Sequence, residues 1–173
     1  MNAGDDQNEG LQKILVDLPN HWATGGESLW AMPLGNDEFE IRNTPFYAYG
    51  LNWGDVVLAI SLEPGLRPVV KKVIRASGNR TLRVFFSKEV DRELQIDHLD
   101  RLKTRGLSYE RATRSLIALD IEASSDFDSI CNDLWKLEKD GVLHYETCEA
   151  RAEGRFDEGP ESVDATDAGI YEN

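Results

Sequence analysis

The chain has 173 residues, of which 40% are hydrophobic and 29% charged, and its formal net charge is −13. This length suits one domain, or two small ones that share a core. No apolar run of about 18 residues occurs, which excludes a transmembrane helix, and the acidic start "MNAGDDQNEG" lacks the pattern of a signal peptide. We therefore expect a cytoplasmic protein without a membrane partner.

The cysteine and histidine content argues against a metal site. The two cysteines, Cys131 and Cys148, lack CxxC spacing, and only three histidines are present. In a cytoplasmic protein both thiols are expected to be reduced. We expect neither a metal nor another cofactor.

The negative charge is concentrated at the two ends of the chain. Nine acids within residues 1–10 and 156–173 carry −9 of the −13, which leaves −4 for residues 11–155. Both ends are poor in apolar residues, so residues 1–10 and 151–173 are predicted to be disordered acidic tails. The segment from Arg67 to Arg114 contains thirteen basic and six acidic residues, and acidic residues outnumber basic ones from Ser115 onward. Such a charge asymmetry can steer a charged partner.

The first half of the chain reads as five short strands. Apolar runs bounded by turn residues predict strands at 12–19, 27–35, 37–43, 55–63 and 67–77. Short strands at this spacing are typical of a small β-barrel or sandwich. We assign this subdomain to residues 11–78.

The second half alternates strands with helices. Strands are predicted at 80–87, 107–112, 115–123 and 142–148, a first helix from Ser87 to about Arg105, and a second from Ser125-Asp126 to Gly141. The apolar arc expected on the first helix comprises Val90, Leu94, His98, Leu99 and Leu102. The order β-α-β-β-α-β is the ferredoxin-like pattern, assigned to residues 79–150. The predicted fold class is thus α+β, with a barrel or sandwich packed on a ferredoxin-like half.

One aromatic-rich stretch, "NTPFYAYGLNWGDVVLAI" at 43–60, has a structural explanation that requires no ligand. Gly54 can take the positive φ of a tight turn, and Asp55 can bond the backbone two residues further on. The aromatic side chains before them would cover a barrel end or the seam between the subdomains. We interpret the stretch as a structural corner.

Four blocks in order, "GESLWAMPLG", "NTPFYAYGLNWGDVV", "SGNRTLRV" and "LIALDIE", resemble an uncharacterised bacterial family, domain of unknown function 4265. The resemblance covers about residues 12–148. It implies a bacterial, cytosolic protein with this fold, and it supplies no catalytic residues.

Two functional hypotheses follow from the absence of a catalytic constellation. The first is a non-enzymatic protein-binding module, most concretely an immunity-type inhibitor of a basic bacterial toxin domain, because acids can mimic a phosphate backbone and speed association. Its contact surface would comprise five acids of the second helix and the residues after it: Asp128, Asp133, Asp140, Glu146 and Glu149.

The alternative is a small-molecule binding protein or an enzyme, with a pocket at the seam between the subdomains. Arginine matches anions and carboxylates bidentately, which makes "SGNRTLR" the best site candidate. The pocket would be lined by Trp30, Tyr47, Trp53, Ser77, Asn79 and Arg83. Tryptophans buried in the cores would favour the protein-binding module, and tryptophans converging on a cleft would favour the pocket.

Nucleic-acid binding is not the leading interpretation. RNA-binding sheets of this class present aromatic side chains on their central strands. "SLIALDI" carries none, and the sequence pI of about 4.6 also argues against a nucleic-acid partner.

Overall fold

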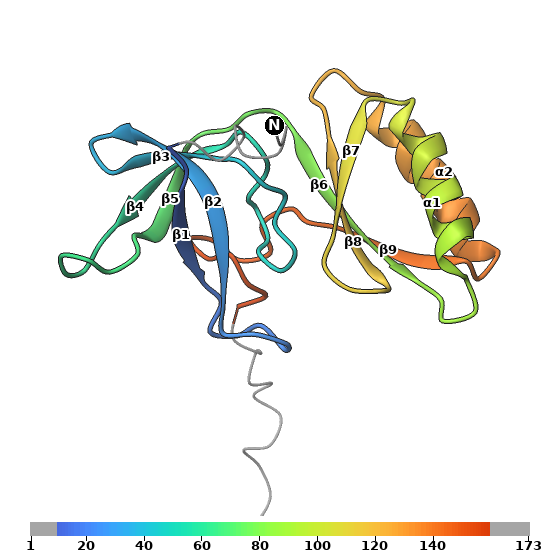
Figure 1. The fold of residues 1–173 in the computed structure, drawn as a ribbon, viewed down its shortest axis with the longest axis horizontal. Coiled ribbons are helices and arrows are strands. Elements are labelled where there is room, and N and C mark those ends of the chain that lie inside the picture. Colours follow the sequence, from blue (N-terminus) through green and yellow to red (C-terminus); the bar gives the residue numbers. More distant parts are fainter. Residues whose placement is uncertain (1–9, 160–173) are drawn as a thin grey trace, which may run out of the picture.

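The computed structural model describes residues 10–159, which form an α+β fold in two halves (Figure 1). The N-terminal half is a closed five-stranded mixed barrel, and the C-terminal half is a four-stranded antiparallel sheet with two helices. The predicted α+β class and the predicted order of elements are confirmed. Neither described helix is long and apolar enough to cross a membrane.

The barrel is built from the five predicted strands: β1 (Gln12–Asp17), β2 (Gly26–Gly35), β3 (Glu38–Ile41), β4 (Val56–Ile60) and β5 (Val69–Arg75). Neighbours pair antiparallel from β1 to β5, and β5 closes on β1 through a parallel contact at Leu15 and Val69. Alternate apolar side chains, such as Ile14 and Val16 of β1, point inward and are fully buried. The barrel interior is therefore a packed core.

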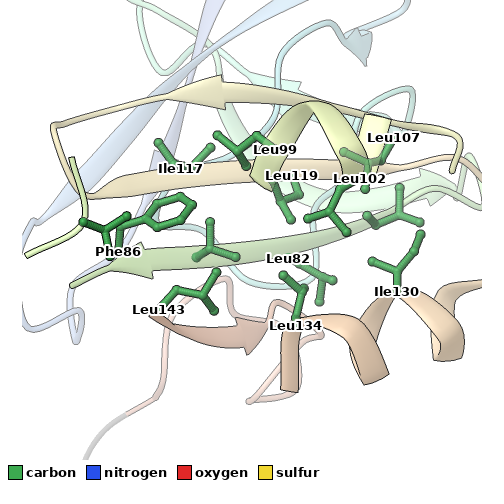
Figure 2. Close-up of a cluster of buried hydrophobic side chains, with 13 residues drawn as sticks. Leu82, Phe86, Leu99, Leu102, Leu107, Ile117, Leu119, Ile130, Leu134 and Leu143 are labelled. Carbon is green, nitrogen blue, oxygen red and sulfur yellow. The ribbon is translucent and has the colours of Figure 1, made fainter. Parts of the chain in front are cut away.

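The second half contains β6 (Arg80–Phe86), α1 (Arg92–Lys103), β7 (Leu107–Arg111), β8 (Leu116–Ile121), α2 (Phe127–Lys139) and β9 (Leu143–Thr147). The strand order is β7-β8-β6-β9. Both helices lie on the sheet face that points away from the barrel (Figure 1). Figure 2 shows Leu99 and Leu102 of α1, with Ile130 and Leu134 of α2, packed toward the strands.

Helix α1 starts later than predicted, and a different set of its side chains is buried. The Asp91 carboxylate accepts a hydrogen bond from the Leu94 N–H at 2.9 Å, which makes Asp91, not Ser87, the N-cap. Val90 thus precedes the helix, and Leu94 is exposed. The buried positions are Gln95, Leu99 and Leu102, because the i, i+4, i+7 face that meets the sheet is rotated from the predicted arc.

Strand β6 divides its side chains between two environments. Leu82, Val84 and Phe86 belong to the core under the helices, as the predicted alternation requires. Thr81 and Arg83 face the barrel instead, where the Thr81 N–H donates to Asn52 Oδ1 at 2.9 Å. The sheet face turned toward the barrel therefore contains the polar residues that matter for the site.

Residues 148–159, which we name the strap, leave β9 and return to the barrel (Figure 1). The Gly50 N–H donates to the Cys148 carbonyl at 2.7 Å, and the Tyr49 N–H to the Phe156 carbonyl at 2.8 Å. Residues 151–159, which the sequence assigns to the C-terminal acidic tail, pack on the barrel here through Phe156 and the buried Asp157. The predicted tail residues 1–9 and 160–173 lie outside the described residues.

Candidate functional site

The aromatic-rich loop at residues 42–55, which we name the bridging loop, connects β3 to β4 between the barrel and the sheet. Its conformation is fixed by the Glu27 carboxylate of β2. This carboxylate accepts three successive backbone N–H groups, from Phe46 at 2.6 Å, Tyr47 at 3.0 Å and Ala48 at 2.9 Å. Consecutive N–H groups that converge in this way form an anion-binding nest. Glu27 is buried, so it is a structural anchor.

The end of the bridging loop is held by a second buried carboxylate. Gly54 has φ +79°, which confirms the predicted turn. Asp55 accepts hydrogen bonds from the Asn52 N–H at 2.9 Å and the Ser77 N–H at 2.8 Å. The predicted bond to a residue two positions further on is absent from the described hydrogen bonds, because Asp55 instead joins the loop to the chain entering β6.

Arg83 on β6 lies at the centre of the seam between the two halves, with its side chain 2% exposed. It donates to Glu146 Oε1 of β9 at 3.1 Å, the residue opposite it in the ladder, and to the Ala48 carbonyl. Its guanidinium lies 4.6 Å from the Tyr49 ring centroid. Burial, with the nearby Glu146 charge, raises the pKa of the Tyr49 hydroxyl to about 12. Arg83 is thus a buried, paired cation that joins β6, β9 and the bridging loop.

A cleft of about 260 Å³ opens beside Arg83, at the seam. Three sequence-distant parts of the chain and the sheet face meet there. Its lining comprises His21, Trp22, Ala23, Phe46, Tyr47, Arg83, Phe85, Thr113, Ser115, Leu116 and Glu146. The lining is largely aromatic and apolar, above one buried ion pair.

His21 organises the aromatic side of the cleft. Its ring stacks on Trp22 at a centroid distance of 5.7 Å and meets Tyr47 edge-on at 5.5 Å. Burial, together with the positive charge of Arg83, lowers the pKa of His21 below its ordinary value of 6.5. The imidazole is therefore mainly neutral at pH 7, and the Arg83 and Glu146 charges offset each other.

The six residues predicted to line a seam pocket separate into two groups. Tyr47 and Arg83 line the cleft. Trp30 lies on the barrel exterior under Lys13, and Trp53 does not line the cleft. Ser77 and Asn79 belong to a polar network outside it, in which the Ser77 N–H donates to Asp55 and Asn79 Nδ2 to Asp120.

Sequence reasoning missed Trp22, Phe46 and Phe85 as cleft residues, together with the anchor Glu27. Two signals were present. Phe85 alternates onto the same face of β6 as Arg83, and Glu27 occupies an inward-facing position of β2, in step with the buried Leu29. An acid at a core-facing strand position requires buried hydrogen-bond donors, and the bridging loop supplies them.

Three of the five acids predicted to contact a protein partner have ion-pair partners within the chain. Asp133 pairs with Arg105 and Lys136, Glu146 with Arg83 and Arg151, and Glu149 with Arg80. Asp128 and Asp140 are exposed and form no ion pair within residues 10–159. The acidic surface available to a partner is smaller than the sequence suggests.

The tryptophans follow neither of the two predicted patterns. Trp22 lines the cleft and is 79% exposed. Trp30 and Trp135 are also exposed, on the barrel and on α2 respectively. The seam contains a cleft, and only one of the four tryptophans lines it.

Comparison with known proteins identifies the fold and leaves the chemistry open. Residues 27–145 match the family described as domain of unknown function (DUF4265), inside the stretch on which the resemblance was based. The chain is also similar to the crystal structure of a hypothetical protein from Neisseria gonorrhoeae, with a TM-score of 0.67 and 16% identity over 80% of this chain and 95% of that one. No curated protein matches. At this identity the likeness concerns the fold alone.

Proposed function

Because the chain belongs to the DUF4265 family, a domain of unknown function, we propose its function from its own geometry: it binds a small molecule in the cleft between barrel and sheet. The observation that carries the proposal is the cleft itself, with mostly apolar walls drawn from separate segments. Ligand sites are typically apolar concavities with a few polar groups, found where structural units meet. The strand order also supports our assignment of the second half as ferredoxin-like.

The floor of the cleft is suited to a binding site because it is held rigid. Arg83 is fixed by Glu146 and the Ala48 carbonyl, and Glu27 fixes the backbone of the Phe46 wall. A site that needs no rearrangement avoids the entropy cost of ordering on binding. This arrangement supports binding to a preformed cleft, and nothing in it requires a reaction.

The proposal is tested by recovering the ligand from a metabolite extract. Purified protein is incubated with an extract of bacterial cells, separated by rapid size exclusion, and its retained small molecules are identified by mass spectrometry. Phe85→Ala, which removes an apolar wall, should abolish retention. Ile96→Ala, on the exposed face of α1, should retain the same compound as the unmodified protein. Equal retention by both variants, or no retained compound at all, would contradict the proposal.

A second candidate, the protein-binding module, is supported by one observation on α2. Trp135 is 51% exposed there, on the helix that also presents Asp128. Exposed tryptophans are frequent energetic centres of protein interfaces. In this alternative the acids would attract a basic partner such as a toxin domain, and Trp135 would anchor it.

This candidate is tested by affinity capture from lysate at moderate salt. A stoichiometric basic protein should bind the unmodified chain, be lost as salt rises, and fail to bind Asp128→Lys combined with Trp135→Ala. If the doubly substituted variant captures as much of the partner as the unmodified chain, α2 is not the interface. Phe85→Ala should leave this capture unchanged, which separates the two candidates.

A further inference from the structure

We infer that the ligand of the cleft is a flat, uncharged molecule of one or two fused rings, which stacks against the His21–Trp22 pair. This inference rests on the proposed function and specifies the class of molecule bound. Three observations carry it: the rigid presentation of Trp22, the balanced charge of the cleft walls, and the volume of the cleft.

Trp22 is exposed, yet the loop that carries it is held in place. The Leu18 N–H donates to the Gly25 carbonyl at 3.0 Å, closing residues 18–25 into a compact loop. Asn20 donates from its backbone and its side chain to Asp157 Oδ2 of the strap, at 2.7 and 3.2 Å. An indole that is 79% exposed at the edge of an apolar cleft leaves a large ring face uncovered. Because the loop is fixed, this face is a preformed stacking surface.

The His21 ring supports the Trp22 indole by stacking on it and is held in a neutral form. The Ala23 N–H donates to His21 Nδ1 at 3.0 Å, so Nδ1 is an acceptor and the ring proton belongs on Nε2. Protonation of Nδ1 would break this bond. The His21 and Trp22 rings are stacked at an inclination of 24°, so His21 supports one face of the indole and leaves the opposite face for a ligand.

The charge of the walls argues against an ionic ligand. Arg83 is the cation that would have received a carboxylate, as expected for the "SGNRTLR" segment, but its charge is already paired with Glu146, and the Ala48 carbonyl accepts a second of its N–H groups. An anion entering the cleft would lose its hydration beside the Glu146 carboxylate and would meet an arginine whose charge is already paired. A cation would also lose its hydration, and it would be repelled by the positive charge of Arg83. A neutral ligand avoids both costs.

The volume of the cleft suits a small ring system. An apolar cavity of about 150 Å³ binds benzene, so a cleft of about 260 Å³ has room for one or two fused rings. Thr113 and Ser115, at the turn between β7 and β8, line the cleft; the Thr113 hydroxyl oxygen accepts the Ser115 and Leu116 N–H groups and keeps its own proton to donate. The two hydroxyl groups can hydrogen-bond polar atoms at the ring edge, which favours a heteroaromatic compound.

The inference is tested with three matched probes: indole-3-carboxamide (flat and neutral), indole-3-carboxylate (flat and anionic) and cyclooctanecarboxamide (neutral and not flat). Binding is followed by the indole N–H resonances of the four tryptophans in nitrogen-15 correlation spectra, with Trp22 assigned from Trp22→Phe. Indole-3-carboxamide should shift the Trp22 resonance and bind at least about fivefold more tightly than either of the other probes, given the usual strength of ring stacking.

Substitutions at Trp22 distinguish stacking from simple apolar contact. Trp22→Leu should weaken the binding of indole-3-carboxamide by about fivefold, whereas Trp22→Phe should largely preserve it. Because these variants lack the Trp22 resonance, their affinities are measured by isothermal titration calorimetry, alongside that of the unmodified protein. Trp135→Ala, an exposed tryptophan on α2, should have no effect and serves as the matched control. Since the Trp22 side chain is exposed, its replacement should leave the remaining indole resonances in place, which verifies the fold.

The outcomes separate this inference from the proposed function. If cyclooctanecarboxamide or the carboxylate binds as tightly as the carboxamide, or if Trp22→Leu has no effect, the flat neutral ligand is ruled out while the cleft remains a binding site. If no probe shifts Trp22, the inference also fails, and the metabolite experiment then decides the proposed function independently.

Discussion

At the residue scale, carboxylates with structural roles define the seam. Glu27, Asp55 and Asp157 are all buried, and each accepts backbone N–H groups from segments distant in sequence. A buried carboxylate is stable only if such donors replace its lost hydration. These acids therefore determine the loop positions that shape the cleft, although none of them lines it.

Replacing Glu27 by alanine should lower the free energy of unfolding by about 1–3 kcal/mol, because three N–H groups of the bridging loop lose their acceptor. The measurement is urea denaturation followed by circular dichroism. Glu63→Ala, at an exposed position of the β4–β5 loop, should change stability little. Equal effects of the two substitutions would show that the nest does not stabilise the fold.

Asp120 should make stability depend on pH in a direction opposite to that of an ion-paired acid. Burial raises its pKa to about 6 from 3.8, although Asn79 donates a hydrogen bond to it. Between pH 4 and 6 the folded state thus binds more protons at this site than the unfolded state, and its contribution falls as pH rises. Asp120→Asn should therefore gain stability relative to the unmodified protein as pH increases from 4 to 7. A constant difference across denaturation curves in this range would refute the assignment.

At the element scale, the strap holds the loops that form the cleft. Gly50 is required where the strap crosses the bridging loop, because its φ is +70° and a Cβ there would lie 2.8 Å from Ala150 Cβ. Further along, Asp157 fixes Asn20 in the loop that carries Trp22. The strap therefore links the two aromatic walls of the cleft.

Asp157→Ala should release the strap and accelerate tryptic cleavage after Arg151 and Arg155, since local opening exposes the backbone to the protease. We expect global stability to fall by about 1–2 kcal/mol from the lost buried hydrogen bonds. Cleavage is followed by mass spectrometry under native conditions, with Asp140→Ala, at an exposed helix end, as the control. Unchanged cleavage rates would indicate that Phe156 alone holds the strap.

At the scale of the whole molecule, Arg83 couples the two halves. Its guanidinium contacts Ala48 and Tyr49 of the bridging loop and Glu146 of β9. A paired charge in such a position is costly to break, because its removal leaves buried partners unsatisfied. We expect the barrel and the sheet to unfold together in the unmodified protein.

Arg83→Met should lower stability by about 3–5 kcal/mol and separate the unfolding of the two halves. Helical signal at 222 nm reports on α1 and α2, which belong to the sheet half. The fluorescence of a Trp135→Phe background reports on Trp22, Trp30 and Trp53 of the barrel half. The two transitions should coincide before the Arg83 substitution and diverge after it. Arg101→Met, at an exposed position on α1, should leave them coincident.

The order of elements was predictable because its signals are local. Alternation marked β6, Gly54 marked a turn, and Asp126 marked the start of α2, which begins one residue later. The start of α1 was misplaced because Ser87 and Asp91 both have side chains that can cap a helix. Only the packing of Leu99 and Leu102 against the sheet selects between them.

The sequence by itself determined the strands, the helices, their order and the alternation that turns Arg83 and Phe85 toward one face, since these depend on residues close together in the chain. Only the tertiary structure decided the cleft. Trp22, Phe46 and Phe85 meet there because carboxylates such as Glu27 bind backbone groups 19 to 21 residues away. It also decided that Arg83 is neutralised and that the strap is ordered to residue 159. Every residue except proline carries the same backbone N–H group. The sequence therefore does not indicate which N–H groups a buried carboxylate will bind.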